Sequence, residues 1–231
     1  MRAHCVRLLP VCAVCQMIPR LIHQCWVNAT PDTERQNNIN SLRNLNKGWQ
    51  YKLWDESTIP AFILNVYGRS MLTAYEAINP KYGAARADLF RYLVICETGG
   101  VYLDIKSLYT RPLETLINPN DELILTGDRR EWHQWHIMCR PKHRILEDVI
   151  AQTLNNIYNY DPKTWGVGKP AVLRVTGPMP YTAAVNAYRD VTGHRVLKPI
   201  PPSLLYDTIG TAERMAEPTH YSNQTEPLIL P

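Results

Sequence analysis

Residues 84–104 read AARADLFRYLVICETGGVYLD, and this stretch decides the fold. Its first part predicts a helix over Ala84–Glu97, because apolar residues recur there on one helical face: Leu89, Leu93 and Cys96. The pair Gly99-Gly100 ends the helix, as glycine commonly does at a helix carboxyl end. The apolar run that follows predicts a buried strand over Val101–Ile105. A helix that leads directly into a buried strand is typical of an α/β protein.

The same alternation extends outward in both directions. Strands are predicted at Leu21–Trp26, Tyr51–Trp54, Leu123–Leu125 and His133–Cys139, and helices at Thr33–Leu45, Ile59–Val66, Met71–Ile78, Ile145–Tyr158 and Tyr181–Val191. We therefore expect one α/β domain over residues 18–231, an αβα sandwich around a single, mostly parallel sheet. Residues 1–17 are expected to be an N-terminal extension, and the Pro-rich tail from Lys198 to wrap the surface.

Composition excludes several classes of protein. The chain has 231 residues, of which 45% are hydrophobic, and a formal net charge of +4 that is not gathered into runs, which argues against nucleic-acid binding. No stretch approaches the ~20 apolar residues of a membrane-spanning helix. The start loosely imitates a signal peptide, but its apolar run contains Pro10 and passes straight into the first predicted strand. The six cysteines show no disulfide-framework spacing. We expect a cytoplasmic protein, or one peripheral at a membrane.

The polar residues in and around the quoted stretch are the candidate site. Side chains alternate along a strand, so Tyr102, Asp104 and Lys106 are predicted to share a face at its carboxyl end, where open α/β sheets place ligands. Asp88 and Arg91 lie three residues apart on the preceding helix and can pair. Two simpler interpretations stay open. The pair is more often an exposed salt bridge worth under ~1 kcal/mol, and Asp104 alone could cap a turn.

The string ARADLFRY at 85–92 with GGVYLD at 99–104 closely resembles the donor-site signature of glycosyltransferase family 32. Three further segments resemble the family's landmarks: IPRLIHQCW at 18–26, WQYKLWD at 49–55 and TGP at 176–178. The resemblance implies a GT-A fold with a DxD motif and a nucleotide-sugar donor. It also implies a divalent ion, Mn²⁺ or Mg²⁺, which acts as a Lewis acid on the diphosphate.

The resemblance assigns roles residue by residue. Asp88 and Asp104 correspond to carboxylates that contact the sugar or the ribose, and Arg91 would hold Asp88 in place. Further donor contacts fall on His23, Trp26, Asp55, Gly99, Gly100, Tyr102 and Lys106. His133 with Trp135 are weaker candidates for an acceptor groove, since aromatic rings stack on sugar faces.

One position departs from the family pattern. Lys106 stands where DxD has its second aspartate, and a lysine offers no oxygen to a hard divalent ion. Three accounts remain. Asp104 holds the ion with a residue of the tail, His220 or Asn223; Lys106 itself neutralises the diphosphate; or the site has lost turnover.

The expected function is transfer of a hexose from a GDP-mannose or UDP-hexose donor to a hydroxyl of a glycan or glycolipid, with retention of the anomeric configuration. A protein acceptor stays open. The alternative is an inactive nucleotide-sugar-binding or lectin-like module. A dinucleotide oxidoreductase and an α/β-hydrolase are excluded, because neither G-x-G-x-x-G after the first strand nor G-x-S-x-G is present.

Overall fold

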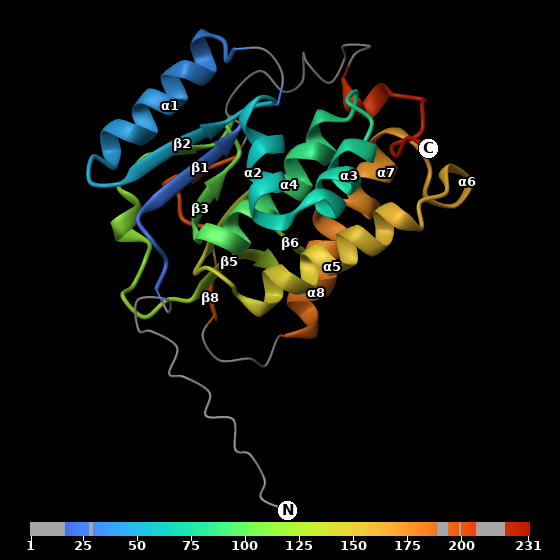
Figure 1. Cartoon of the computed structure of the whole chain (residues 1–231). Coiled ribbons are helices and arrows are strands. Elements are labelled where there is room, and N and C mark those ends of the chain that lie inside the picture. The colour runs from blue at the N-terminus through green and yellow to red at the C-terminus, as the bar shows by residue number, and fades with distance from the viewer. Residues whose placement is uncertain (1–16, 28–29, 189–193, 199, 207–219) are drawn as a thin grey trace, which may run out of the picture.

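A computed structural model describes residues 17–27, 30–188, 194–198, 200–206 and 220–231 (Figure 1). Nearly all of the predicted N-terminal extension lies outside these ranges. The strands are β1 (Leu21–Cys25), β2 (Gln50–Trp54), β3 (Gly100–Leu103), β4 (Leu108–Tyr109), β5 (Leu123–Asp128), β6 (Glu131–Trp132), β7 (His136–Cys139), β8 (His194–Leu197) and β9 (Leu204–Leu205). The helices are α1 (Thr33–Leu45), α2 (Thr58–Tyr67), α3 (Arg69–Ala77), α4 (Gly83–Thr98), α5 (Arg144–Tyr158), α6 (Pro162–Trp165), α7 (Gly168–Val175) and α8 (Pro178–Ala187), with short 3-10 turns η2 (Leu113–Thr115) and η3 (Tyr221–Asn223).

The central sheet has the order β2-β1-β3-β7-β5-β6, with β8 paired to β5. β1 is parallel to both β2 and β3, and β8 is parallel to β5. β7 runs antiparallel to both of its neighbours, so β5 points the same way as β3. The sheet is therefore mostly parallel, as predicted, and β7 and β6 are the two strands that run against the rest.

Helices cover both faces of this sheet. Figure 1 shows α1 alone on one side and α2 to α5, α7 and α8 gathered on the other. The larger core lies on the second side and includes Tyr102 and most of α4. The smaller core lies under α1 and includes Ile22, Leu42 and Val101. Neighbouring residues of β3 thus bury their side chains in different cores, as alternation along a strand requires.

α4 is the central helix of the larger core. Every residue from Asp88 to Cys96 is buried, because other helices and the sheet surround it. A helix buried on all sides cannot keep one polar face, so the charges that it carries must be paired inside the protein. The predicted bounds of this helix were right to within one residue at each end.

The carboxyl-terminal segment differs from the prediction of a tail on the surface. Leu228 is fully buried in the larger core, and Ile229 bridges to Ile78. Tyr82 donates its hydroxyl to the carbonyl of Glu226 at 2.6 Å. Apolar residues at the end of the chain therefore complete the core beside α3 and α4. Along the described ranges, no helix has the length and apolar character needed to cross a bilayer.

Candidate active site

A buried arginine joins the two predicted carboxylates. Nη2 of Arg91 lies 3.0 Å from Oδ1 of Asp88 and 3.1 Å from Oδ1 of Asp104. The side chains of Arg91 and Asp88 are 5% and 4% exposed, whereas that of Asp104 is 21% exposed. The pair on α4 is thus no solvated salt bridge, and breaking a buried pair of this kind costs roughly 3–5 kcal/mol. The structure fixes one charge chain from the helix to the carboxyl end of β3.

Asp88 is held on all sides by protein donors. Besides Arg91, the amide Nε2 of Gln134 donates to its Oδ1 at 3.0 Å and the hydroxyl of Thr176 to its Oδ2 at 3.0 Å. Burial raises the pKa of the Asp88 carboxyl, and Arg91 opposes that shift. Because the protein already occupies both carboxylate oxygens, the structure gives Asp88 the task of orienting Arg91 in place of the predicted direct contact with sugar or ribose.

Arg91 is fixed by more than its carboxylates. Nη1 donates to the backbone carbonyl of Gln134 at 3.0 Å, and the guanidinium lies 4.7 Å from the ring centre of Tyr102. Burial alone would lower the pKa of Arg91, but the charges of Asp104 and Asp88 more than offset that effect. The guanidinium therefore stays positive and immobile at the end of the sheet.

Of the three charged residues Asp88, Arg91 and Asp104, Asp104 is the one that reaches the surface of the site. The hydroxyl of Tyr102 donates to its Oδ1 at 3.2 Å, and its backbone N–H donates to the carbonyl of Trp135 at 2.8 Å. Its Oδ2 has no partner among the described residues. That oxygen is the one available to a ligand hydroxyl. Tyr102 itself is buried, so it positions Asp104 and has no open face for the donor.

Lys106 sits in a turn and not on the predicted strand. β3 ends at Leu103, and the N–H of Ser107 donates to the carbonyl of Asp104 at 2.8 Å to close a turn over residues 104–107. Alternation along a strand therefore does not extend to Lys106, and the reason given for placing it on the face of Asp104 was wrong. The half-buried Lys106 nevertheless lies in the same four-residue turn as Asp104.

Gln134 and Thr176 are site residues that sequence reasoning missed. Gln134 lies between β6 and β7, in a segment predicted to be continuous strand, and its Oε1 also accepts from the hydroxyl of Tyr92 at 2.6 Å. Thr176 was noted only as part of a turn. The local sequence offers no signal for either, because each meets Asp88 across 46 or 88 residues of chain.

His23 has a structural task instead of the predicted donor contact. Its ring is fully buried, Nδ1 accepts from Nε1 of Trp54 at 2.9 Å, and Nε2 lies 3.0 Å from the hydroxyl of Thr98. Since Nδ1 is an acceptor, the proton of the neutral ring is assigned to Nε2. Burial lowers the pKa of His23 to about 4. This histidine ties β1 to β2 and to the end of α4.

Trp26 and Asp55 follow the carboxyl ends of β1 and β2. Trp26 is half-buried, its N–H donates to the carbonyl of Trp54 at 2.8 Å, and the guanidinium of Arg35 lies 4.5 Å from its ring centre. Asp55 is exposed, and its carboxylate accepts from the N–H and hydroxyl groups of Ser57 and Thr58. Those hydrogen bonds lower the pKa of Asp55 to about 2. These hydrogen bonds give Asp55 a structural role at the start of α2, whereas the contact of Trp26 with a base stays a prediction.

Gly99 and Gly100 lie at the far end of β3 from Asp104. Four residues of strand separate Gly100 from Asp104, about 13 Å at ~3.3 Å per residue. Both glycines have positive φ, and a Cβ on Gly100 would lie 2.3 Å from the carbonyl oxygen of Leu21. They are needed for the close approach of α4, β3 and β1. Because they lie at the opposite end of β3 from Asp104, they do not make the predicted contact with the donor.

The end of the chain returns to the site. η3 contacts α7, and the ring of Tyr221 is half-buried against the larger core. Burial and the charges of Asp88 and Asp104 raise the pKa of Tyr221, which puts its hydroxyl in their electrostatic field. The sequence did not point to Tyr221.

The predicted acceptor residues lie side by side. The ring centres of His133 and Trp135 are 5.6 Å apart in a stacked arrangement, and the ring centre of Trp135 lies 4.6 Å from that of Tyr206.

The residues that the structure describes around Asp104 do not fit a divalent metal. His220, the second predicted ligand, accepts at Nδ1 from the N–H of Ser222 at 3.3 Å and packs on Tyr221. Within the ranges that the structure describes, no group of three or more His, Cys, Asp or Glu side chains is placed to hold an ion. Asp104 is a single carboxylate with Arg91 bonded to it and a lysine two residues on. This donor set is better suited to an anion than to a cation.

Comparison with known proteins agrees with this geometry. Residues 32–123 match the family model described as a glycosyltransferase sugar-binding region containing a DXD motif. An inositol phosphoceramide mannosyltransferase 1 of Schizosaccharomyces pombe is 27% identical over 200 residues, which cover 83% of this chain and 58% of that protein. The mannosyl phosphorylinositol ceramide synthase SUR1 of Saccharomyces cerevisiae is 30% identical over 171 residues, which cover 71% and 41%. The chain thus spans about half the length of the curated relatives it matches.

A solved structure shows the same fold. The UDP-bound glycosyltransferase domain of the YGT toxin aligns with a TM-score of 0.57 at 10% identity, over 93% of this chain and 83% of that one. At that identity the likeness establishes the fold alone, which is of the GT-A type. Over residues 32–123 the chain is therefore similar to glycosyltransferases whose sugar-binding region contains a DXD motif, and Asp104 and Lys106 lie within that matched stretch.

Proposed function

We propose that this protein transfers a hexosyl group from a nucleoside-diphosphate sugar to a hydroxyl of a glycan or glycolipid, with retention at the anomeric carbon. The observation that carries the proposal is the buried Arg91, held between Asp88 and Asp104 at the carboxyl end of β3. The mannosyltransferase names among its relatives favour GDP-mannose as the donor. The UDP-bound structural neighbour makes a UDP-hexose the second donor class.

The site offers fixed charges where a nucleotide sugar needs them. The leaving diphosphate gains negative charge as the bond to the sugar breaks, and a preorganised cation stabilises that charge more than it stabilises the ground state. Arg91 is held still by two carboxylates, a backbone carbonyl and the Tyr102 ring, and it fixes Asp104 in place. This proposal assigns the diphosphate to the positive charge of Lys106, a donor hydroxyl to Oδ2 of Asp104 and the base to the ring of Trp26.

The proposed chemistry is a single front-face step. The bond from the anomeric carbon to the diphosphate oxygen breaks, the acceptor oxygen bonds to that carbon on the same face, and its proton passes to the leaving phosphate. A double displacement would instead need a free carboxylate as nucleophile. Asp88 is buried and accepts from three protein groups, and this proposal assigns the open Oδ2 of Asp104 to a donor hydroxyl, so neither is assigned as the nucleophile.

Charge neutralisation at the diphosphate falls to a lysine in this proposal. A metal would supply Lewis-acid assistance to the leaving group, but the donor set described above does not provide for one. Lys106 lies in the turn that carries Asp104, and an ammonium group balances phosphate charge without any oxygen ligand. We therefore assign Lys106 to the diphosphate.

A nucleotide-sugar-binding module without turnover is the second candidate. Lys106 is the observation that favours it. A lysine in place of the second aspartate of DXD keeps a positive charge for the diphosphate but removes a carboxylate that could bind a metal ion. The two candidates predict equal donor binding and differ in product formation.

The test is a donor panel measured by calorimetry, with Mn²⁺ and again with EDTA, followed by an assay of transfer and of donor hydrolysis. We expect binding of GDP-mannose or a UDP-hexose that persists in EDTA, together with slow hydrolysis or transfer. Asp104→Asn should abolish turnover, while the exposed Glu76→Gln on α3 should match the wild type. Binding without any turnover supports the second candidate, and no binding to any nucleotide sugar overturns both.

A further inference from the structure

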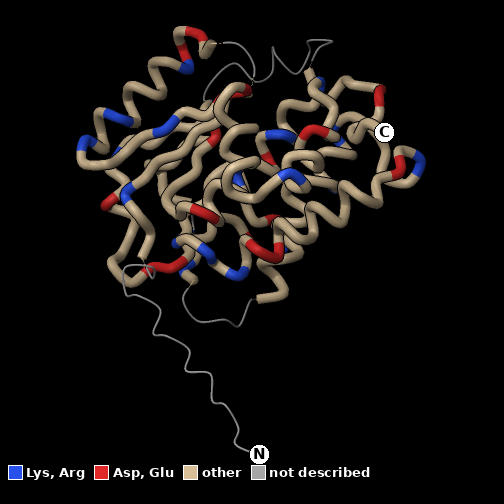
Figure 2. The backbone as a smooth tube through the Cα atoms, in the orientation of Figure 1, with Lys and Arg blue, Asp and Glu red and all other residues tan. Residues whose placement is uncertain are grey.

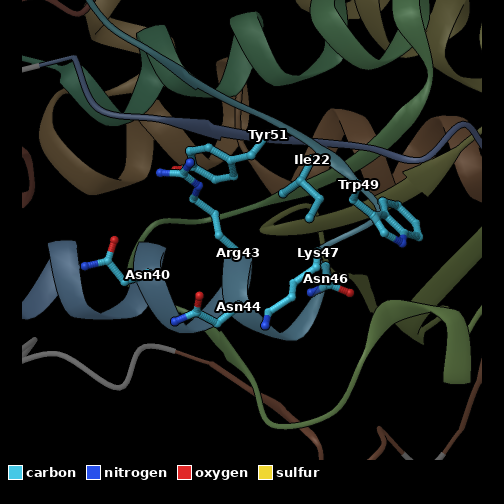
Figure 3. Close-up of a pocket in the computed structure, with 8 residues that line it drawn as sticks. All are labelled: Ile22, Asn40, Arg43, Asn44, Asn46, Lys47, Trp49 and Tyr51. Carbon is cyan, nitrogen blue, oxygen red and sulfur yellow. The ribbon is translucent and has the colours of Figure 1, made fainter.

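A second pocket lies on the α1 face of the sheet, away from the charge chain. It has a volume of about 510 Å³, within the range of small-molecule sites, and is formed between α1, the turn after it and the first residues of β2 (Figure 3). Its lining includes Ile22 and other members of the smaller core, whereas Tyr102 and Arg91 stand on the opposite face of the sheet. The two sites are therefore separated by the sheet itself.

The pocket is lined by cations and amides without a single acid. Asn40, Arg43, Asn44 and Lys47 follow one another at helical spacing along one flank, and Figure 3 shows Arg43 reaching towards Tyr51. The carboxyl half of α1 carries blue and no red positions in Figure 2. Neither Arg43 nor Lys47 has a carboxylate partner among the described residues. Like charges this close repel, and no carboxylate among the described residues offsets that repulsion.

The opposite wall of the pocket consists of two aromatic rings. Trp49, which directly precedes β2, and Tyr51 on β2 both line the pocket, and both are half-buried. The hydroxyl of Tyr51 donates to Oε1 of Gln24 at 2.9 Å, which anchors the ring and leaves its face to the pocket. The guanidinium of Arg43 lies 5.5 Å from the centre of that ring. Positive side chains are common at the carboxyl end of a helix, where they stabilise its dipole. That explains the charge of Arg43 and Lys47, but not the two aromatic rings in the same pocket.

We propose that this pocket binds an acidic sugar, a pyranose ring that carries a phosphate or a carboxylate. Arg43 and Lys47 would take the anionic group, the amides of Asn40 and Asn44 would bond ring hydroxyls, and the rings of Trp49 and Tyr51 would pack on the apolar face of the sugar. The site is independent of the transfer reaction, because none of these residues belongs to the Asp104 centre.

The experiment titrates the full chain without nucleotide by calorimetry, using glucose 6-phosphate and glucuronate as probes and glucose and inorganic phosphate as comparisons. We expect both acidic sugars to bind at least ten times more tightly than either comparison, and their affinity to fall as salt is raised. Tight binding of one acidic sugar alone identifies whether phosphate or carboxylate is preferred. Inorganic phosphate that binds as tightly as glucose 6-phosphate would reduce the pocket to a general anion site and overturn the proposal.

Variants locate the binding. Arg43→Gln and Lys47→Gln should each weaken glucose 6-phosphate at least five-fold, and Asn44→Ala should weaken the sugar phosphate but not inorganic phosphate. All three side chains are exposed, so these variants are expected to fold. The exposed Arg69→Gln on α3 removes the same charge elsewhere and should change nothing. Equal loss in Arg69→Gln, or none in the pocket variants, contradicts the assignment. Donor binding is measured on the same samples, so failure of this proposal is distinguished from failure of the transferase proposal.

Discussion

The side-chain amide of Gln134 donates to Oδ1 of Asp88 at 3.0 Å, while its backbone carbonyl accepts from Nη1 of Arg91 at the same distance. One residue between β6 and β7 is thus hydrogen-bonded to both members of the ion pair on α4. The next residue, Trp135, accepts from the backbone N–H of Asp104. The charge chain at the end of β3 is therefore set by a segment that comes 30 residues after Asp104 in the sequence.

Replacing Gln134 by leucine is expected to weaken donor binding. The change removes one donor from a buried carboxylate and leaves the hydroxyl of Tyr92 without its Oε1 acceptor. A hydrogen bond to a charged group contributes about 1.5–3 kcal/mol. If that free energy is needed to hold the site in the form that binds the donor, its loss lowers donor affinity by roughly 10- to 100-fold. Calorimetry with the preferred donor measures the change.

Two further variants separate positioning from a general loss of stability. Gln152→Leu on α5 replaces a half-buried glutamine outside the described site, and it should retain wild-type donor affinity. Gln134→Glu keeps the size but brings a second carboxylate towards Asp88, so its donor affinity should fall below that of Gln134→Leu at neutral pH and recover partly at lower pH. Equal affinity in all variants would show that Gln134 does not orient Arg91.

Sequence reasoning identified what is local at this site. Helical spacing gave the bounds of α4, and the i, i+3 rule paired Asp88 with Arg91. It did not predict that the pair is buried, because burial depends on the helices that pack around α4. Gln134, Thr176 and Tyr221 are brought in by tertiary contacts, and neither periodicity nor a local motif marks such partners.

The errors have the same origin. The strand was extended past Leu103 because Ile105 is apolar, but a hydrogen bond from Ser107 to Asp104 turns the chain there. The resemblance assigned His23 to the donor at a strand end, yet its register against Lys52 and Tyr102 places it in the interior of the sheet. Sequence gives the residue types, and pairing across the sheet decides which of them reach the ligand.

Gly100→Ala is expected to destabilise the fold strongly. Gly100 has a φ of 98°, and an added Cβ would lie 2.3 Å from a backbone oxygen that cannot move without β1. Strain and overlap together should cost at least about 3 kcal/mol, or roughly 6–12 °C in melting temperature for a chain of this size. Gly48→Ala is the matched control, because an added Cβ there meets nothing within 4 Å. Similar melting temperatures for the two variants would contradict this account.

Acid should destabilise the protein through its buried histidines. Burial lowers the pKa of His23 to about 4, of His136 to about 3 and of His143 to about 4. The unfolded chain takes up protons near pH 6.5 and the folded one does not, so this stability is complete above pH 6.5 and is lost as pH falls towards 4. His23 alone accounts for up to about 3 kcal/mol.

Urea unfolding at pH 7.5, 5.5 and 4.5 measures this loss. His23→Asn keeps an acceptor for Nε1 of Trp54 but does not titrate, so it should be less stable at pH 7.5 and lose less on acidification. The free energy of unfolding is compared at each pH, because the variant changes the neutral value as well. A variant with the same pH dependence as the wild type would assign the acid sensitivity to other groups.

Lys106→Asp should convert the site to metal-dependent donor binding. The substitution restores a second carboxylate two residues after Asp104 and removes the ammonium that we assign to the diphosphate. Two acids and the diphosphate then offer the oxygen ligands that a divalent ion needs. We expect EDTA to weaken donor binding at least ten-fold in this variant and less than three-fold in the wild type, measured by calorimetry. Lys163→Asp on α6 makes the same charge change away from the site and should behave as the wild type does. If the wild type itself requires Mn²⁺, Lys106 does not replace the ion, and the ligands must come from residues outside the group described above.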